Sequence, residues 1–476
     1  MESNIAEPHT IVAEASIGQV EYLKQIQSVN EGQRPPYMQV ELQRLSIDLP
    51  ALERTIAFLV ERHESLRTVF PNIDGHIKQV VKPFSVEEFG LEIIDCGDLS
   101  SVPDGSKQPY FKKAVAGFSD IGKGPLVKFF LFGTSDDLYD FSMLIHHIIC
   151  DEWSLNILKN ELYAAYQAFV METEPELPPL RWHLRDYSKQ QNTWLRQNTA
   201  EISTFWKDKL EKFYNQLFDA GLYYKGYLSR NDPRLAIQLP EKKEHTRREL
   251  LKLLDTQDAV SYITVVTGEC YKHIKKLSQN NGYSIAAIIY TSLYIFLNLY
   301  TGKRKILMAS LVADRLTQDK QKLVGCLLGA IYIPRELSPD AEVNHAIEET
   351  YRNLLINADN LIFDHDILGI DGQKLRAACD MYVNYIGQKG SVVSKDILPA
   401  KVHLADVDIY YAINCQILEF DNGFAFRWRY NKHLFDHKVI EDMADCYDIV
   451  LSSVGEYPTL TVEDLINLVR QRATAL

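Results

Sequence analysis

Apolar residues gather in two short runs, residues 125–134 and 138–149, and a polar turn at 135–137 separates them. Short apolar runs bounded by turn residues are typical of β-strands. After Asp151 the apolar spacing becomes helical, at Leu155, Leu158, Leu162, Ala165 or Tyr166, and Phe169. Asp151 and Ser154 both lie where helix N-cap residues are favoured. The pattern therefore predicts two strands, a sharp turn and a helix.

Helical spacing also occurs upstream, in residues 46–70. This segment begins with a candidate N-cap, Asp48, and carries an apolar stripe at Leu52, Ile56, Leu59 and Val60. The longest apolar run, 285–300, contains Thr291, Ser292 and Asn298. It therefore predicts a buried helix rather than a membrane span. Helix and strand signals alternate along the chain, which indicates the α/β or α+β class.

A proline-rich stretch, EPELPPLRWH, marks a boundary. It has three prolines within five residues, Pro175, Pro178 and Pro179, and it follows one helical stretch and precedes another. Such a composition is typical of a linker between compact parts. We expect an N-terminal lobe over residues 1–174, a linker over 175–183 and a C-terminal lobe over 184–476.

Composition narrows the classes of partner. The 476 residues carry a net charge of −13, which argues against nucleic acid, because phosphate binding needs a basic surface. The N-terminus has neither the basic start nor the apolar core of a signal peptide. The seven cysteines are scattered without a CxxC pair, as expected of reduced thiols. We therefore expect a cytoplasmic protein without membrane contact.

The stretch LIHHIICDEWS, residues 144–154, carries the candidate chemistry. A metal site, an acid/base site and a structural turn, in which Asp151 only caps the helix, are all compatible with it. Successive side chains on a strand point to opposite faces. His146 and His147 would then lie on different faces, which disfavours a metal site that needs both imidazoles.

A second segment, RHESLRTVF at residues 62–70, changes the balance between these alternatives. With both segments in order, the chain resembles the condensation domains of nonribosomal peptide synthetases, whose signatures are RHExLRTxF and HHxxxDG(W)S. The first signature is matched by Arg62, His63, Glu64, Leu66, Arg67, Thr68 and Phe70. The second is matched by His146, His147, Asp151, Trp153 and Ser154.

The resemblance extends through nearly the whole chain. Segment 16–23 keeps Ser16 and Gln19 of a further family motif, and 184–195 and 300–315 resemble later family segments. Segment 324–337 resembles a glycine-led strand. It keeps Gly325, Pro334 and Arg335 but has Leu-Gly-Ala where Val-Asn-Thr is common.

The resemblance implies an α/β fold of two chloramphenicol-acetyltransferase-like lobes in a V arrangement. It also implies an active-site tunnel at their junction. A donor thioester would arrive on the 4'-phosphopantetheine arm of a carrier protein, and an amine would arrive as the acceptor. The resemblance implies no permanently bound cofactor and no metal. No glycine-rich phosphate loop occurs in the sequence, so we expect no nucleotide requirement either.

The resemblance also implies roles for single residues. His147 would manage the amine proton and position the reactants, and His146 would pack or form hydrogen bonds. Asp151 would pair with an arginine and hold the turn, with Arg315 as the first candidate and Arg335 as the second. The remaining structural residues would be Arg67 and Arg62.

One position departs from the family pattern. Glycine usually follows the motif aspartate, and this chain has Glu152. Glu152 either points to solvent at the start of the helix, where a carboxylate suits the helix dipole, or lines the tunnel and favours a cationic amine. The other candidates for lining the tunnel or setting specificity are Trp153, Ser154, Gly325 and Arg335.

The leading interpretation is a condensation enzyme that forms an amide from a carrier-bound acyl or aminoacyl thioester and an amine. Its alternatives are an ester-forming or acyl-CoA-dependent acyltransferase and a non-catalytic platform for docking carrier proteins. An epimerase relative is a weaker alternative. The start at Met1 favours a freestanding protein, which would meet its carrier protein in trans, and we expect a monomer.

Overall fold

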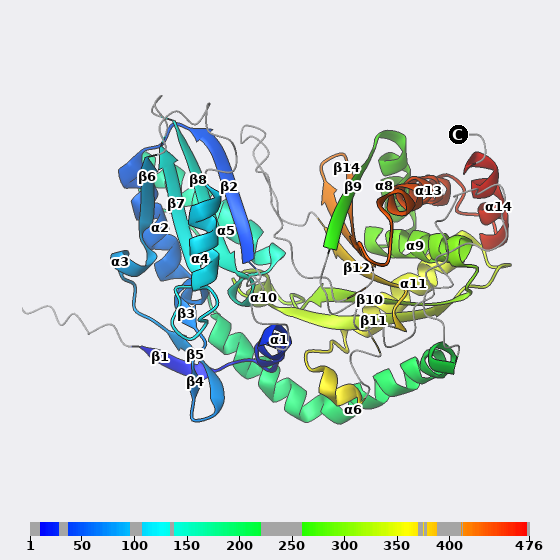
Figure 1. The fold of residues 1–476 in the computed structure, drawn as a ribbon, viewed down its shortest axis with the longest axis horizontal. Helices are drawn as coiled ribbons and strands as arrows, with labels where there is room; N and C mark the ends of the chain where they lie inside the picture. Colours follow the sequence, from blue (N-terminus) through cyan, green and yellow to red (C-terminus); the bar gives the residue numbers. More distant parts are fainter. Residues whose placement is uncertain are drawn as a thin grey trace, which may run out of the picture. The chain divides into compact units, whose positions relative to one another are not determined.

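The computed structural model describes residues 10–27, 37–95, 107–133, 138–219, 259–369, 375, 378–387, 411 and 413–473 (Figure 1). By their contacts these residues divide into two compact units. The first unit contains the described residues up to Gln197 and the segment Ala313–Leu328. The second unit contains the other described residues. The expected turn at 135–137 lies outside the described residues.

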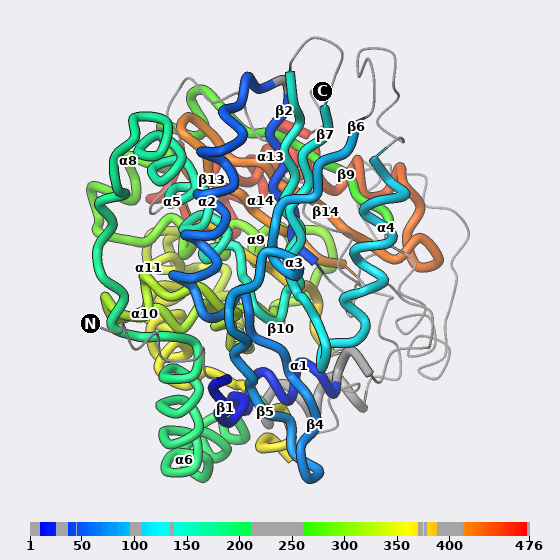
Figure 2. Tube along the Cα trace, turned by 90° about the vertical axis from the view of Figure 1, so that its left-hand side faces the viewer, coloured from blue at the N-terminus to red at the C-terminus, as the bar shows by residue number. Residues whose placement is uncertain are grey.

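The first unit is built on a four-stranded sheet of order β2-β8-β7-β6. Its strands are β2 (Tyr37–Leu45), β6 (Leu91–Asp95), β7 (Val127–Gly133) and β8 (Tyr139–His146). The neighbours pair antiparallel, except β6 and β7, which are parallel. Helices α2 (Leu49–Arg62) and α5 (Glu152–Val170) cover one face, and α4 (Gln108–Gly117) covers the other (Figures 1 and 2).

A smaller sheet completes the first unit. Strand β5 (His76–Val81) pairs antiparallel with β1 (Ile11–Glu14), β3 (Thr68–Val69) and β4 (Asn72–Ile73). The remaining elements are short: α1 (Ile17–Gln27), η1 (Glu64–Arg67), α3 (Val86–Phe89), η3 (His147–Ile149) and α10 (Gln318–Gln321). The long helix α6 (Leu184–Asp219) begins in this unit.

The elements predicted from local patterns are confirmed. Asp48 caps α2 by accepting a hydrogen bond from the Ala51 N–H at 2.9 Å, and the predicted apolar stripe is buried. Asp151 likewise caps α5. The strand predicted over 138–149 is shorter than expected, because β8 ends at His146 and His147 begins the 3₁₀ turn η3.

The division by contacts differs from the lobes predicted at 1–174 and 184–476. Residues 184–197 and the segment Ala313–Leu328 belong with the first unit. The reason is packing: Leu184 and Tyr187 form one buried cluster with Leu323 and Leu327. A proline-rich stretch marks where the chain leaves a helix, but it carries no information about where later segments pack.

The second unit contains a six-stranded sheet of order β11-β10-β12-β13-β14-β9. Its strands are β9 (Ala259–Thr267), β10 (Lys305–Ala313), β11 (Leu328–Glu336), β12 (Met381–Ile386), β13 (Ile413–Phe420) and β14 (Gly423–Asn431). β12 pairs parallel with β10 and β13, and β14 pairs antiparallel with β13 and β9. Mixed sheets of this kind confirm the α/β class.

The helices of the second unit are α8 (Gly268–Asn281), α9 (Ile285–Thr301), α11 (Val343–Ala358), α13 (His437–Glu456) and α14 (Val462–Ala473). The predicted buried helix is confirmed as α9, which is almost entirely buried. Among the described residues no single helix is long and apolar enough to cross a membrane. Only α8 and α9 taken together pass that test, and they are bent by 117°.

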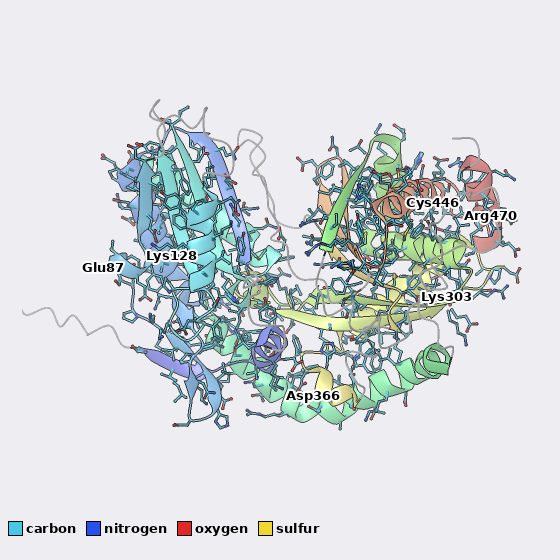
Figure 3. All side chains as sticks on the ribbon, in the orientation of Figure 1. Glu87, Lys128, Lys303, Asp366, Cys446 and Arg470 are labelled. Carbon is cyan, nitrogen blue, oxygen red and sulfur yellow. The ribbon has the colours of Figure 1, made fainter. Side chains whose placement is uncertain are left out.

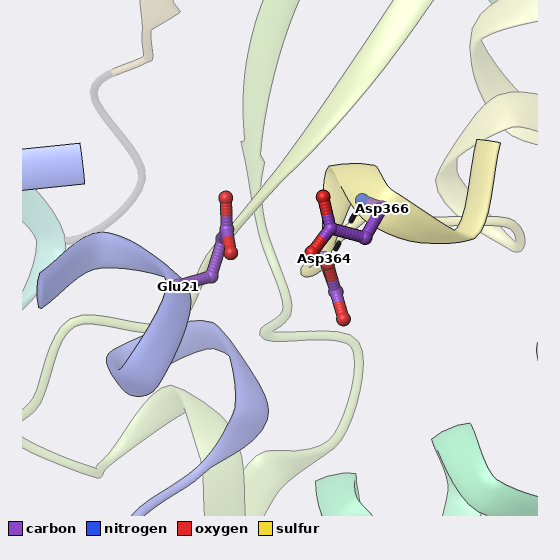
Figure 4. Close-up of side chains that lie close together, drawn as sticks. All are labelled: Glu21, Asp364 and Asp366. Carbon is purple, nitrogen blue, oxygen red and sulfur yellow. Dashed lines mark hydrogen bonds between the residues drawn. The ribbon is translucent and has the colours of Figure 1, made fainter. Parts of the chain in front are cut away.

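Polar side chains fasten the ends of elements in the second unit. Lys303, labelled in Figure 3, forms an ion pair with Asp380 at 2.8 Å, and Asp380 also accepts from the Leu307 N–H at 2.9 Å. Asp364 accepts a hydrogen bond from the Asp366 N–H at 2.9 Å and so caps η4 (His365–Leu368), as Figure 4 shows. The contacts of Asp380 join two distant segments of the unit, and that of Asp364 is local.

Candidate active site

His146 is the last residue of strand β8, and its backbone, its Nδ1 and its ring each have a partner. Its backbone N–H donates to the Leu126 carbonyl at 2.8 Å, and its Nδ1 accepts from the Ile148 N–H at 3.0 Å. Its ring packs edge-to-face on Phe118. Burial, with a smaller effect of the neighbouring His147, lowers the pKa of His146 to about 3. His146 is therefore a neutral, structural residue that caps the turn.

His147 begins that turn, and its environment differs. Its Nδ1 is buried and, among the described residues, no hydrogen-bond partner has suitable geometry. Burial lowers the pKa of His147, and nearby backbone carbonyls and the charge of Asp151 oppose that shift. The Tyr22 ring lies against the imidazole, with centroids 5.8 Å apart. His147 is thus a neutral imidazole at ordinary pH, and no carboxylate of the described residues forms a hydrogen bond with its Nδ1.

The two histidines are separated for a reason other than the predicted one. The prediction relied on strand alternation through both residues. The strand instead ends at His146, so the 3₁₀ turn gives His147 its own direction.

Asp151 follows this turn and is almost completely buried, with 1% of its surface exposed. Its Oδ1 accepts from the Ser154 N–H at 2.8 Å, which caps α5. Its Oδ2 accepts from the Leu327 N–H at 3.2 Å. Arg315 Nη2 donates to both carboxylate oxygens, at 2.8 and 2.9 Å. The carboxylate therefore joins the turn to the segment Ala313–Leu328.

Arg315 is equally buried and has further partners. Its Nη1 donates to the carbonyls of Lys320 and Leu323, at 2.7 Å each. Arg315, the first candidate, therefore pairs with Asp151 as expected. The second candidate, Arg335, is wrong as a partner of Asp151. It lies in the second unit and donates to Thr350 and to Glu349, because those acceptors stand on α11 beside β11.

Gly325 and Ser154 close the contact between α5 and the segment Ala313–Leu328. The Gly325 N–H donates to Ser154 Oγ at 3.0 Å. A Cβ at Gly325 would lie 2.5 Å from Leu184 Cδ1, so any larger residue here would force the Leu184 side chain to move. Trp153 adds a further link, since its indole N–H donates to the Gln321 carbonyl at 2.9 Å. The contacts of these three residues are structural.

The other signature segment, residues 62–70, contacts α5 through Glu161. Arg62 and His63 both contact Glu161 on α5, with closest distances of 2.8 Å. Burial tends to raise the pKa of Glu161, but the bonds from His63 and Arg62 prevail and lower it. Glu64 binds Arg185 at the start of α6 at 2.8 Å.

Among the residues that the structure describes, the hydrogen-bond partners of Arg67 are all backbone carbonyls. It donates to the carbonyls of Val60, Glu61 and Lys82, and burial lowers its pKa. These contacts tie the end of α2 to the end of β5, in agreement with a structural role. Arg62 has a similar role through Glu161 and the Pro178 carbonyl, which it contacts at 2.6 Å.

Glu152 is the first residue of α5. Its Oε2 is buried and, among the described residues, has no hydrogen-bond partner, so the interpretation that it simply points to solvent is wrong. Burial raises the pKa of Glu152, while Lys159, on the same side of the helix, acts to lower it. No charge interaction with His147 contributes to this shift.

Sequence reasoning missed three partners in this region: Glu161, Arg185 and Tyr22. Glu161 was detectable as a carboxylate beside the apolar stripe of α5, next to the buried Leu162. Tyr22 follows the motif residues Ser16 and Gln19 by a few positions but carries no chemical signal of its own.

The arrangement can move a proton. A neutral imidazole accepts a proton from a nucleophile that approaches its free nitrogen. Among the described residues, no group of side chains with metal-binding geometry includes His146 or His147. The buried Asp151–Arg315 ion pair holds the turn that carries the imidazole, and the charge of Asp151 partly offsets the lowering of the His147 pKa by burial.

Comparison with known proteins agrees with the sequence motifs. A family model described as "Condensation domain" matches residues 25–476. One of the linear gramicidin synthase proteins of Brevibacillus parabrevis is 26% identical over 429 residues, which cover 87% of this chain. Bacitracin synthase 1 of Bacillus licheniformis is 23% identical over 447 residues, which cover 90% of this chain. The chain spans only 8% of the length of each of these relatives.

Solved structures show the same fold. The condensation domain of Monacolin K polyketide synthase superposes with a TM-score of 0.73 at 15% identity, covering 95% of this chain and 99% of the other. The epimerization domain from the third module of a tyrocidine synthetase superposes with a TM-score of 0.67 at 15% identity, covering 99% and 100%.

Proposed function

The chain belongs to the condensation domain family, and from this premise we propose that it forms an amide from a carrier-bound acyl or aminoacyl thioester and an amine. The placement of His147 carries the proposal. Its imidazole is neutral and stands at a turn held by the Asp151–Arg315 ion pair, and no carboxylate of the described part of the chain forms a hydrogen bond with its Nδ1. Such a group suits a nucleophile that must lose a proton.

The amine nitrogen attacks the thioester carbonyl, and the C–N bond forms while the proton passes to His147. In this proposal the neutral imidazole carries its proton on the buried Nδ1, and Nε2 is the acceptor. The tetrahedral intermediate then collapses, the C–S bond breaks, and the sulfur leaves with the proton. His147 returns to its neutral form.

Asp151 does not orient the imidazole as a triad carboxylate does. Both of its oxygens bind Arg315, and they also accept the backbone N–H groups of Ser154 and Leu327. Its role is to hold the turn that carries His147. His146 caps the same turn, and Arg62 contacts α5 through Glu161. Arg67 ties the end of α2 to the end of β5.

The substrates are large and arrive from outside. The donor is carried on the 4'-phosphopantetheine arm of a carrier protein in trans, and the acceptor is an amine, either free or carrier-bound. We expect a cytoplasmic monomer that needs no resident cofactor. Glu152, with its buried and unpaired oxygen, is the candidate for selecting a cationic acceptor.

Two other reactions have support from particular observations. A hydroxyl can give its proton to His147 as an amine does, which would yield an ester, also from an acyl-CoA donor. The likeness to the tyrocidine synthetase epimerization domain supports proton removal at the α-carbon of a bound aminoacyl group. A carrier-docking platform would not require the chemistry of His147 at all.

The test is a transfer assay read by mass spectrometry. Carrier proteins loaded with acyl- or aminoacyl-phosphopantetheine are mixed with the enzyme and with a pool of either amines or alcohols. We expect an amide product that His147→Ala abolishes and that His76→Ala, at an exposed histidine of the same unit, leaves unchanged. An ester, or an inverted α-carbon, would identify the other reactions. Amide formation that His147→Ala does not affect would refute the proposal.

A further inference from the structure

The two motif histidines have different aromatic neighbours. His146 packs on Phe118, with ring centroids 6.1 Å apart, and Phe118 is fully buried beside the sheet. His147 instead packs against Tyr22, at 5.8 Å with the ring planes inclined by 51°. Tyr22 comes from α1, an element that neither signature segment includes. The imidazole proposed to act therefore has a neighbour of its own.

Helix α1 is anchored at its start by reciprocal capping. The Ser16 N–H donates to Gln19 Oε1 at 2.8 Å, and the Gln19 N–H donates to Ser16 Oγ at 3.1 Å. This capping box satisfies backbone donors that a helix start leaves unpaired. Gln79 on β5 donates to Gln19 Oε1 at 3.0 Å and ties the cap to the small sheet.

Helix α6 fixes the same end of α1 from the other side. Asn192 Oδ1 accepts from the Ile17 N–H at 2.8 Å, and Asn192 Nδ2 donates to the Ala15 carbonyl at 3.0 Å. Gln191 Oε1 accepts from the Gly18 N–H at 3.0 Å. With its first turn fixed in this way, α1 holds Tyr22 at a defined place, because the next residue, Leu23, is buried in the core.

His147 needs such a contact. Its Nδ1 has no hydrogen-bond partner of suitable geometry among the described residues, and Asp151 is engaged by Arg315. An aromatic ring beside the imidazole both limits its rotation and keeps water from that side. We propose that Tyr22 is a positioning residue, which holds the His147 imidazole in its orientation through ring contact from α1.

The groups that act on His147 limit the alternatives. Asp151 is the titratable side chain that acts on the pKa of His147, while His147 in turn lowers the pKa of His146. Tyr22 is the aromatic group packed on His147 from α1. Tyr22→Ala leaves His146 and Asp151 in place and removes only the ring. Tyr22→Phe keeps the ring and removes the hydroxyl. A change seen in the first variant and absent from the second therefore reports the ring contact.

The inference concerns catalysis only if the proposed function holds, so the first measurement does not use activity. Histidine labelled with ¹³C is titrated by NMR in the full chain, and the His147 signal is identified by its loss in His147→Ala. In Tyr22→Ala we expect the pKa of His147 to rise toward the ordinary value of about 6.5, since water reaches the ring. Tyr22→Phe should titrate as the unmodified protein does.

The second measurement is transfer activity. We expect Tyr22→Ala to lower kcat/KM by about 10- to 100-fold, as misplaced catalytic groups do, and Tyr22→Phe to restore it. Tyr163→Ala, at an exposed tyrosine on α5 of the same unit, is the matched control and should change neither measurement.

The outcomes separate the two proposals. A His147 signal whose pKa and chemical shift are the same in Tyr22→Ala overturns the positioning role, whatever the activity. The expected NMR shift without transfer activity in any protein supports the positioning role and overturns the proposed function. An equal loss of kcat/KM in Tyr22→Phe and Tyr22→Ala assigns the effect to the hydroxyl and overturns the role of the ring contact.

Discussion

Replacing Asp151 by alanine tests the most buried charge in the site. Asp151 and Arg315 expose only 1% and 2% of their side chains. The carboxylate accepts two hydrogen bonds from Arg315, two from backbone N–H groups and one from the Ser154 hydroxyl. Alanine removes all of these. The guanidinium then remains buried without a counter-ion, since its other acceptors are neutral.

The expected loss is large compared with the stability of a protein. Breaking a buried ion pair from one side costs about 3–5 kcal/mol, and loss of an N-cap costs about 1 kcal/mol. Because one carboxylate performs both functions, we expect about 4–5 kcal/mol in total rather than a larger sum. Total stabilities are about 5–15 kcal/mol, so the variant should fold only marginally.

A double substitution separates charge from packing. In Asp151→Asn with Arg315→Met, neither side chain leaves an unpaired charge, so the pair should lose less stability than Asp151→Ala alone. The matched control is Glu174→Ala, which breaks the exposed pair with Arg54 and should cost no more than about 0.5 kcal/mol.

Urea unfolding measures the free energies, and hydrogen exchange locates the effect. The Ser154 and Leu327 amides, which both donate to Asp151, should exchange faster in Asp151→Ala than in the control. A loss below about 1 kcal/mol together with unchanged exchange at these two amides would refute the reasoning.

Three further outcomes follow from single contacts. Gly325→Ala should destabilise by about 1–3 kcal/mol because its Cβ would lie 2.5 Å from Leu184 Cδ1. In urea unfolding this loss should be smaller when it is measured in a Leu184→Ala background than in the unmodified protein; an equal loss in both backgrounds would mean that another contact is responsible. The acid limb of kcat/KM should have its midpoint below the ordinary histidine value of about 6.5, because burial lowers the pKa of His147 and the neutral base persists to lower pH; a midpoint above that value in a pH–rate profile would contradict the proposed site. Glu161→Gln should cost about 1–3 kcal/mol at pH 7, and the difference from the unmodified protein should shrink below about pH 4.3. The reason is that a carboxylate whose pKa is lower in the folded state stabilises the fold above its unfolded-state pKa, and this stabilisation is lost as pH falls through its folded-state pKa. A difference in unfolding free energy that is the same at pH 7 and below about pH 4.3 would count against a charge effect.

Much of the local structure was predictable from the sequence, because its causes are local. Asp48 and Asp151 cap helices through their own neighbours, and the stripe from Leu52 to Val60 needs only helical periodicity to be recognised. The burial of α9 follows from its composition. The two signature segments, matched residue by residue, indicated the family and named His147 before any contact was known.

Pairings between distant segments were decided by the tertiary structure alone. The choice between Arg315 and Arg335 depended on which strand end lies near α5, and strand spacing does not carry that information. Glu161 and Tyr22 were missed for the same reason, since each acts through a partner more than ninety residues away in the chain. Glu152 is the clearest example of what the sequence does not determine. Its identity marked an exception to the family pattern, and only the fold showed that its carboxylate oxygen Oε2 is buried. A sequence thus determines which groups are present and which local turns they favour, whereas packing determines which of them meet.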